Sequence, residues 1–208
     1  MSYMIVKHGS SRSFPEGEAV LGSASESADI VVHLGGGFAA DPDKAAVLVE
    51  LDTECLGAHT GEESGREGSN AIGFARFING TGPSQLIELV RQPNTDENAL
   101  SAAKSLFEAA GFQTAVSADQ AGRIIDRLVR PKYNAALRFL DEGLASAEAM
   151  DLTCRLGLGY AQGPIEAVTD AGLSRHHDVT LAIFASTGQA GFVPARAAVI
   201  AKTREGLK

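Results

Sequence analysis

The sequence predicts two regions, an α/β domain over residues 1–118 and an all-α domain over residues 119–208. In the first region the apolar residues come in short runs flanked by Gly, Ser or Pro, which is typical of strands in a buried sheet. After residue 118 they recur at helical spacing instead. A chain of this length suits one domain or two small ones.

Six apolar runs in the first region predict strands, at residues 4–6, 28–32, 46–49, 71–74, 85–90 and 112–116. Residues 98–110 differ from these runs because Leu100, Leu106 and Phe107 recur at helical spacing and Gly111 supplies a stop. A strand, a helix and another strand in succession favour an α/β layer.

The second region opens with a continuous apolar helical face that ends at Gly143. Pro131 lies inside this run and removes one backbone donor, so we expect a kink or a tight helical break near Val129. Further helices are predicted at residues 147–156, 164–170, 175–187 and 194–206.

Composition limits the classes of partner. The chain has 18 basic and 26 acidic side chains and a net charge of −8, which gives no electrostatic support to a nucleic-acid or acidic-membrane partner. No apolar run approaches the roughly 20 residues of a membrane span, so we expect a cytoplasmic protein. Cys55 and Cys154 lack zinc-site spacing, which predicts buried, reduced thiols and no metal site.

Two motifs in the helical region carry a family resemblance. The segment Gly122-Arg-Ile-Ile-Asp-Arg-Leu-Val-Arg-Pro131 leads, through an acidic segment at 146–151, to Gly157-Leu-Gly-Tyr-Ala-Gln-Gly-Pro164. This order resembles the helical domain of the 3-hydroxyacyl-CoA dehydrogenases, which read G-F-(I/V)-V-N-R-(I/L) and then G-x-G-Y-P-x-G-P. The resemblance implies a truncated Rossmann-like sheet domain followed by a helical dehydrogenase C-terminal-type domain. It is nearest to the degenerate second module of long enzymes of phenylacetate and aromatic-acid degradation.

The family holds NAD with a glycine-rich turn and a helix after its first strand. Here residues 4–7 are followed by His8-Gly-Ser-Ser-Arg-Ser-Phe-Pro15, with one glycine where three are needed. The resemblance therefore implies no cofactor, or NAD if the protein is active.

A second glycine motif is a weak cofactor-binding alternative. Gly35, Gly37 and Ala40 form G-x-G-x-x-A after a predicted strand, and Glu50 or Asp52 ends the next strand, where a ribose-binding carboxylate would lie. Residues 42–45 leave little room for the helix that such a fingerprint requires, which favours a plain glycine turn.

The resemblance also implies a catalytic histidine, oriented by a glutamate twelve positions later. Arg76-Phe-Ile-Asn-Gly80 stands in place of the family's H-F-F-N-P, and Glu88 lies twelve positions after Arg76. Because a guanidinium cannot accept a proton at neutral pH, the base is lost. We expect Glu88 to form an ion pair with Arg76, although an exposed strand carboxylate without a role remains an alternative.

Two further family positions are changed. Glu54, in Asp52-Thr-Glu-Cys55, replaces a serine of the family's N-T-S-S, and Asp126 replaces the asparagine of N-R. The histidines elsewhere offer little compensation. His59, His176 and His177 are expected in loop, capping or surface roles, while His8 and His33 remain open as displaced bases.

These observations support a degenerate dehydrogenase-like protein that keeps a structural, dimerising or acyl-CoA-related binding role. The alternative is an active NAD-dependent 3-hydroxyacyl-CoA oxidoreductase with a rearranged site. We expect a homodimer through the helical domain and leave open an acyl-CoA or a partner protein as a further partner. The residues divided between core and interface would be Ile124, Ile125, Leu128, Val129, Leu137, Phe139 and Leu140.

Overall fold

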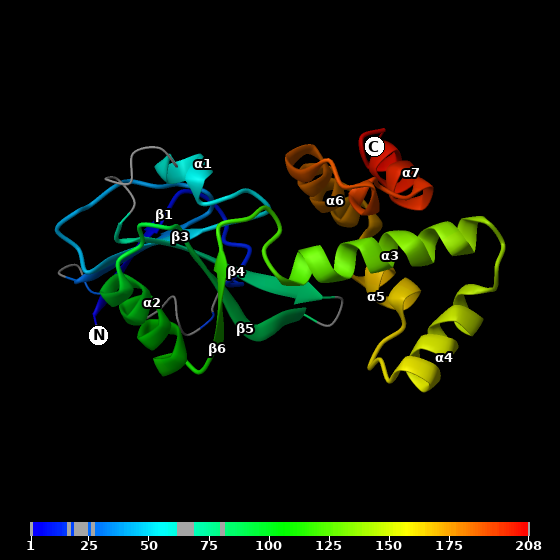
Figure 1. The fold of residues 1–208 in the computed structure, drawn as a ribbon, viewed down its shortest axis with the longest axis horizontal. Helices are drawn as coiled ribbons and strands as arrows, with labels where there is room; N and C mark the ends of the chain where they lie inside the picture. The colour runs from blue at the N-terminus through cyan, green and yellow to red at the C-terminus, as the bar shows by residue number, and fades with distance from the viewer. Residues whose placement is uncertain are drawn as a thin grey trace. The chain divides into compact units, whose positions relative to one another are not determined.

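A computed structural model describes residues 2–15, 18, 25, 28–61, 69–79 and 82–207, without the side chain of residue 79. The chain divides into two compact units, drawn in Figure 1. The sheet unit comprises Met1–Phe77 and Pro83–Arg123, and the helical unit comprises Ile78–Gly82 and Ile124–Lys208. The predicted domain boundary after residue 118 stays a prediction, and each unit is described by itself.

The sheet contains six strands whose spatial order follows the chain, β1-β2-β3-β4-β5-β6. Their bounds are β1 Tyr3–Lys7, β2 Ile30–Leu34, β3 Ala46–Glu50, β4 Ala71–Asn79, β5 Gly82–Arg91 and β6 Gln113–Ala118. The pairs β1/β2, β2/β3, β3/β4 and β5/β6 are parallel. Only two residues separate β4 from its neighbour β5, and a connection that short joins antiparallel strands. The predicted Rossmann-like sheet is confirmed, with these four pairs parallel.

Side chains alternate between the two faces of the sheet, and one face packs on α2 (Glu97–Ala109). That face carries Leu48, Phe74 and Leu89, which join Leu106 and Phe107 of the helix in the main core. Asp96 caps the helix by accepting a hydrogen bond from the backbone N–H of Asn98. Burial of this apolar surface is the main stabilising term of the unit.

The opposite face carries a smaller cluster. Val49, Leu51 and Val90 pack there with Leu56, which directly precedes the short helix α1 (Gly57–Thr60). Asp119 fixes that helix start because its carboxylate accepts the backbone N–H groups of Leu56 and Gly57 at 2.6 and 2.8 Å. The sequence pattern had not predicted α1, which is too short to show a helical period.

The helical unit contains five α-helices and one 3-10 turn in the described part of the chain. These are α3 (Ile125–Asp141), α4 (Ala147–Leu158), α5 (Pro164–Asp170), α6 (Leu173–Thr187), η2 (Ala190–Phe192) and α7 (Arg196–Glu205). Its main core groups Tyr133, Leu137 and Val168. The predicted helical region is therefore confirmed.

Of the kink or break expected near Val129, the break does not occur, because α3 runs on through Pro131 to Asp141; the kink stays a prediction. A proline inside a helix costs one backbone hydrogen bond, which packing can offset. Here the helix packs on α5 and on η2, and Gly191 of η2 lies against the proline ring.

Three expectations from the composition concern the cysteines, a metal site and a membrane span. Cys55 and Cys154 are free, as expected, but they are only partly buried. Among the described residues, no group of three His, Cys, Asp or Glu side chains is placed to hold a metal ion. No helix in the described ranges has both the length and the apolar character needed to cross a membrane.

Candidate functional site at the carboxyl edge of the sheet

The carboxyl ends of β1, β2 and β3 meet at one edge of the sheet, where a parallel α/β fold places its ligands. A pocket of about 280 Å³ opens at this edge. Its walls come from the loops that follow the three strands: Gly9, Ser10, Arg12, Gly35, Gly36, Glu50, Leu51, Asp52 and Glu54. Carboxylates outnumber the cationic side chain in that wall, so the pocket presents a negative surface.

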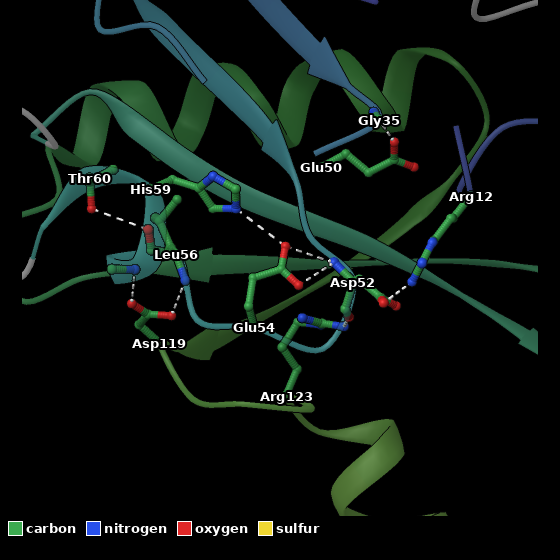
Figure 2. A network of polar contacts seen from close by, with 11 residues as sticks. Arg12, Gly35, Glu50, Asp52, Glu54, Leu56, His59, Thr60, Asp119 and Arg123 are labelled. Atoms are coloured by element: carbon green, nitrogen blue, oxygen red, sulfur yellow. Dashed lines mark hydrogen bonds and ion pairs between the residues drawn. The ribbon is translucent and has the colours of Figure 1, made fainter. Parts of the chain in front are cut away.

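Glu50 is the buried anchor of this edge. It ends β3 and is 3% exposed. Its Oε1 accepts hydrogen bonds from the hydroxyl of Ser11 at 2.8 Å and the backbone N–H of Ser13 at 2.6 Å. Its Oε2 accepts the N–H of Gly35 at 2.8 Å. The carboxylate thus binds the loops after β1 and β2 to the end of β3, and Figure 2 shows its contact with Gly35.

Asp52 and Glu54, two and four residues after Glu50, make further polar contacts beside the pocket. Asp52 forms an ion pair with Arg12. Glu54 accepts the backbone N–H of Asp52 at 3.1 Å and lies 3.2 Å from Nε2 of His59 (Figure 2). The carboxylate that replaces the family serine is therefore engaged within its own loop, and His59 is less isolated than the sequence suggested.

A buried ion pair lies behind this loop. Glu88 and Arg123 have side chains 4% and 3% exposed, with Oε2 and Nε separated by 3.7 Å. Arg123 also donates to the backbone oxygen of Asp52. Its Nε and Nη1 have no hydrogen-bond acceptor among the described residues. Sequence reasoning missed Arg123, although a charged residue at an otherwise apolar motif position was a usable signal.

The expected pairing of Arg76 with Glu88 is wrong. Arg76 donates to the carboxylate of Glu18 at 2.7 Å and to the backbone oxygen of Ser13 at 3.0 Å. Its guanidinium carbon also lies 4.7 Å from the centre of the Phe112 ring. Glu88 lies between the core residues Ile87 and Leu89 and so points to the opposite face of the sheet from Phe74 and Arg76. Nor is Glu88 the exposed carboxylate of the alternative.

Asp126, which replaces the family asparagine, belongs to the helical unit. Its Oδ1 accepts from Nε of Arg130 at 2.7 Å, one helical turn later. Nη1 of Arg130 lies within hydrogen-bond distance of Nδ1 of His176, at 3.2 Å. On the other side of the ring, Nε2 of His176 lies 2.9 Å from Oδ1 of Asn134. The same Asn134 oxygen accepts the N–H of Ala195. The ring therefore donates from Nε2 and accepts at Nδ1.

His176 contradicts its expected capping or surface role, because its side chain is fully buried. Burial, followed by the positive charge of Arg130, lowers the pKa of His176 to about 3. A neutral ring is what its hydrogen bonds require.

The two histidines left open as displaced bases lie together at the sheet edge. Nε2 of His8 is 2.9 Å from Nδ1 of His33, and the two rings stack. Burial and then the nearby His8 lower the pKa of His33, which also packs on Phe38. Their catalytic use stays untested.

The glycine turn after β2 fits the chain itself more closely than a cofactor. A Cβ on Gly35 would lie 2.5 Å from the backbone nitrogen of Gly9, and one on Gly37 would overlap the His8 ring. No helix follows in residues 35–45, all of which are described. The residues present do not fit a dinucleotide pyrophosphate, which needs free N–H groups and a helix start where Glu50 already places a carboxylate.

Comparison with known proteins shows which protein family the helical half resembles. Residues 122–204 match the model of the family described as 3-hydroxyacyl-CoA dehydrogenase, C-terminal domain. Sheet and match together define a Rossmann-like sheet domain followed by a helical dehydrogenase C-terminal domain. The match covers less than half of the chain, so the similarity to the 3-hydroxyacyl-CoA dehydrogenase family is shown for its helical half.

Two relatives illustrate the extent of the likeness. The chain is 35% identical over 97 residues to 3-hydroxybutyryl-CoA dehydrogenase of Bradyrhizobium diazoefficiens, covering 47% of this chain and 33% of the relative. It is 31% identical over 97 residues to human mitochondrial hydroxyacyl-coenzyme A dehydrogenase, covering 47% and 31%. The match thus spans about a third of the length of these relatives.

The fold likeness extends further than the sequence likeness. The crystal structure of (S)-3-hydroxybutyryl-CoA dehydrogenase from Ralstonia eutropha matches with a TM-score of 0.73 at 20% identity. This match covers 85% of this chain and 66% of that chain. At such identity the comparison establishes the fold alone.

Proposed function

We propose that this chain is a catalytically degenerate 3-hydroxyacyl-CoA dehydrogenase-like protein whose helical half keeps a structural and dimerising role. The observation that carries the proposal is the setting of Arg76. Arg76 stands where the family has its catalytic histidine. Its guanidinium donates hydrogen bonds to the backbone oxygen of Ser13 and the carboxylate of Glu18, and it faces away from Glu88. Oxidation of a hydroxyl by hydride transfer needs a group that accepts the hydroxyl proton, and a guanidinium does not serve.

The other replaced positions support the same proposal. Glu54 accepts hydrogen bonds from its own loop, and Asp126 is paired with Arg130. Ionised carboxylates are acceptors only, so neither side chain can donate to a substrate oxygen as the family's serine and asparagine do.

The test is acetoacetyl-CoA-dependent oxidation of NADH by the full chain. We expect no turnover above the uncatalysed background. Turnover within the ordinary enzymatic range of about 1 to 1000 per second would overturn the proposal.

The dimer part of the proposal rests on apolar side chains exposed on the helical unit. Leu128 is 70% exposed and Leu156 is 80% exposed, and Phe139 and Leu144 are exposed as well. Exposed apolar side chains that gather into a patch typically mark an interaction site, and these four residues are the candidates for such a patch. Leu137, in contrast, is buried in the core.

The ligand and the cellular setting are further parts of the proposal. An acyl-CoA ester or a partner protein would bind the retained helical half, in a cytoplasmic protein related to the second module of aromatic-acid-degrading enzymes. A thermal-shift screen of CoA esters tests the ligand, since a compound that binds only the folded state raises the melting temperature. No shift at millimolar ester would leave a partner protein as the remaining candidate.

One observation favours the alternative of an active NAD-dependent oxidoreductase. The contact between Glu54 and His59 is a carboxylate–imidazole pair beside the pocket, an arrangement that orients a general base. This alternative requires a bound nicotinamide. Calorimetry with NAD and NADH separates the two functions, because absence of binding at millimolar concentration would exclude the active enzyme.

A further inference from the structure

The segment after β1 lies beside the carboxyl edge of the sheet, where a parallel α/β fold places its ligands. Phe14 is 3% exposed and joins the main core, with its ring near those of Phe74, Phe107 and Phe112. Ser13, its neighbour, is 1% exposed. Ser13 and Phe14 thus belong to the interior of the sheet unit, whereas Ser11 is partly buried and Arg12 is exposed beside the carboxyl edge.

This segment is held from two sides. Glu50 binds the hydroxyl of Ser11 and the N–H of Ser13, while Arg76 binds the backbone oxygen of Ser13 and lies 5.8 Å from the centre of the Phe14 ring. The Glu50 carboxylate therefore accepts the backbone N–H of Ser13, and the Arg76 guanidinium donates to the backbone oxygen of the same buried residue. Hydrogen bonds to charged groups are stronger than neutral ones.

We propose that residues 11–14 form a built-in plug, held by Glu50 and Arg76, that closes the carboxyl edge of the sheet to dinucleotides. The Glu50 carboxylate occupies the N–H groups of Ser13 and Gly35, which a pyrophosphate would need. It also brings a negative charge to the position of an anionic ligand. This inference rests on the proposed degenerate function and gives Arg76 a role of its own: the residue at the base's position is a positioning residue for the plug.

The test measures amide hydrogen exchange of Ser13 and Gly35 by NMR on the full chain. We expect both amides to be protected in the natural protein. Glu50→Gln keeps the size of the side chain but removes its charge, so both amides should exchange at least about 10-fold faster. Glu54→Gln is the matched control, since Glu54 binds Asp52 and His59 but not the plug. It should change neither amide more than about 2-fold.

Arg76→Lys provides a second variant, should Glu50→Gln fail to fold. It keeps the charge but loses the forked donors that reach Ser13 and Glu18 together, so the Ser13 amide should again exchange faster. Calorimetry on the natural chain adds a measurement that needs no variant. We expect no NADH binding up to about 1 mM, which corresponds to a binding free energy weaker than about −4 kcal/mol.

Several outcomes would overturn the plug. They are rapid Ser13 exchange in the natural protein, equal acceleration by Glu54→Gln, and NADH binding with a Kd below about 1 mM. NADH binding without turnover would overturn the plug and leave the degenerate function standing. Turnover with acetoacetyl-CoA would overturn both.

Discussion

The two units treat buried charge differently. In the helical unit Arg130 is bound by Asp126 and His176, and His176 in turn is bound by Asn134. In the sheet unit Arg123 is equally buried and lies 3.7 Å from Glu88, yet its Nε and Nη1 have no hydrogen-bond acceptor in the described part of the chain. Among the described residues, the buried side-chain polar atoms without a partner lie in the sheet unit, on Arg123 and Ser117.

This difference suggests which unit still has its original task. A fully satisfied polar network fixes the packing of α3 against α6 and the segment around Ala195, which a structural or dimerising domain needs. The sheet unit keeps its strands, and two charged side chains near its carboxyl edge bind the loop after β1: Glu50 binds Ser11 and Ser13, and Arg76 binds Ser13. Both units thus keep their fold, and the loss of catalysis that we propose would lie at this edge.

The largest expected effect comes from breaking the helical network. Arg130→Met leaves Asp126 as a buried carboxylate without its partner, which typically costs about 3 to 5 kcal/mol of unfolding free energy. Urea unfolding followed by circular dichroism measures the loss. Arg155→Met is the control, because Arg155 pairs with Glu166 at an exposed site and should cost at most about 1 kcal/mol. Equal losses in the two variants would contradict the account.

Acid should weaken the same network. Because burial lowers the pKa of His176 to about 3, the unfolded chain binds a proton at this residue near its ordinary value of 6.5, while the folded chain does not. Stability from this residue is therefore complete above pH 6.5 and falls as the pH drops from 6.5 toward 3. The slope is at most about 1.4 kcal/mol per pH unit. His176→Asn should flatten the dependence in urea unfolding between pH 4 and 7, and an unchanged slope would refute the assignment.

Substitutions at two adjacent glycines distinguish the cost of close packing from the cost of backbone strain at the sheet edge. Gly35 and Gly36 both have positive φ, at 79° and 84°. A methyl group on Gly36 meets nothing within 4 Å, whereas one on Gly35 meets the backbone of Gly9. Gly36→Ala should therefore cost about 1 to 2 kcal/mol for the left-handed conformation alone. Gly35→Ala should cost a further 1 to 3 kcal/mol, roughly, for overpacking. Equal losses would show that the turn is not packed on Gly9.

The smallest expected effect on stability comes from Leu128→Glu, and its comparison with Leu137→Glu distinguishes an interface residue from a core residue. Leu128→Glu changes an exposed side chain and should alter unfolding free energy by no more than about 0.5 kcal/mol, yet it should halve the mass measured by light scattering if the helical unit dimerises. Leu137→Glu, within the core, should unfold the unit instead. A natural chain with a mass near 21.6 kDa would refute the dimer.

The spacing of apolar residues predicted both units: short runs indicated the sheet and helical spacing indicated the helices. Burial of apolar side chains sets both patterns. The ends of two strands were harder to predict from the sequence. Strand β4 extends beyond its apolar run to Asn79, and β5 begins before its run, at Gly82, because a hairpin can continue with polar residues. Pairing of Arg76 with Glu88 was predicted from spacing in the family motif. The two-residue period of a strand, with Ile87 and Leu89 apolar on either side of Glu88, already argued against it.

The candidate site was only partly predictable from the sequence. Glu50 was recognised as the carboxylate that ends its strand, but its partners Ser11 and Ser13 are 39 and 37 positions away. Contacts over such separations depend on how the chain folds back, which local patterns do not contain. His176 was misjudged for the same reason, because its partners Arg130 and Asn134 lie on another helix.

The most direct test of catalytic degeneracy is a paired assay of the natural chain and Arg76→His. Both are given acetoacetyl-CoA and NADH, and the loss of NADH absorbance is followed at matched enzyme concentration. If the site is degenerate beyond its base, neither protein will oxidise NADH above background, because the imidazole restored at position 76 faces away from Glu88. Turnover of about 1 per second or more by the natural chain would contradict the account.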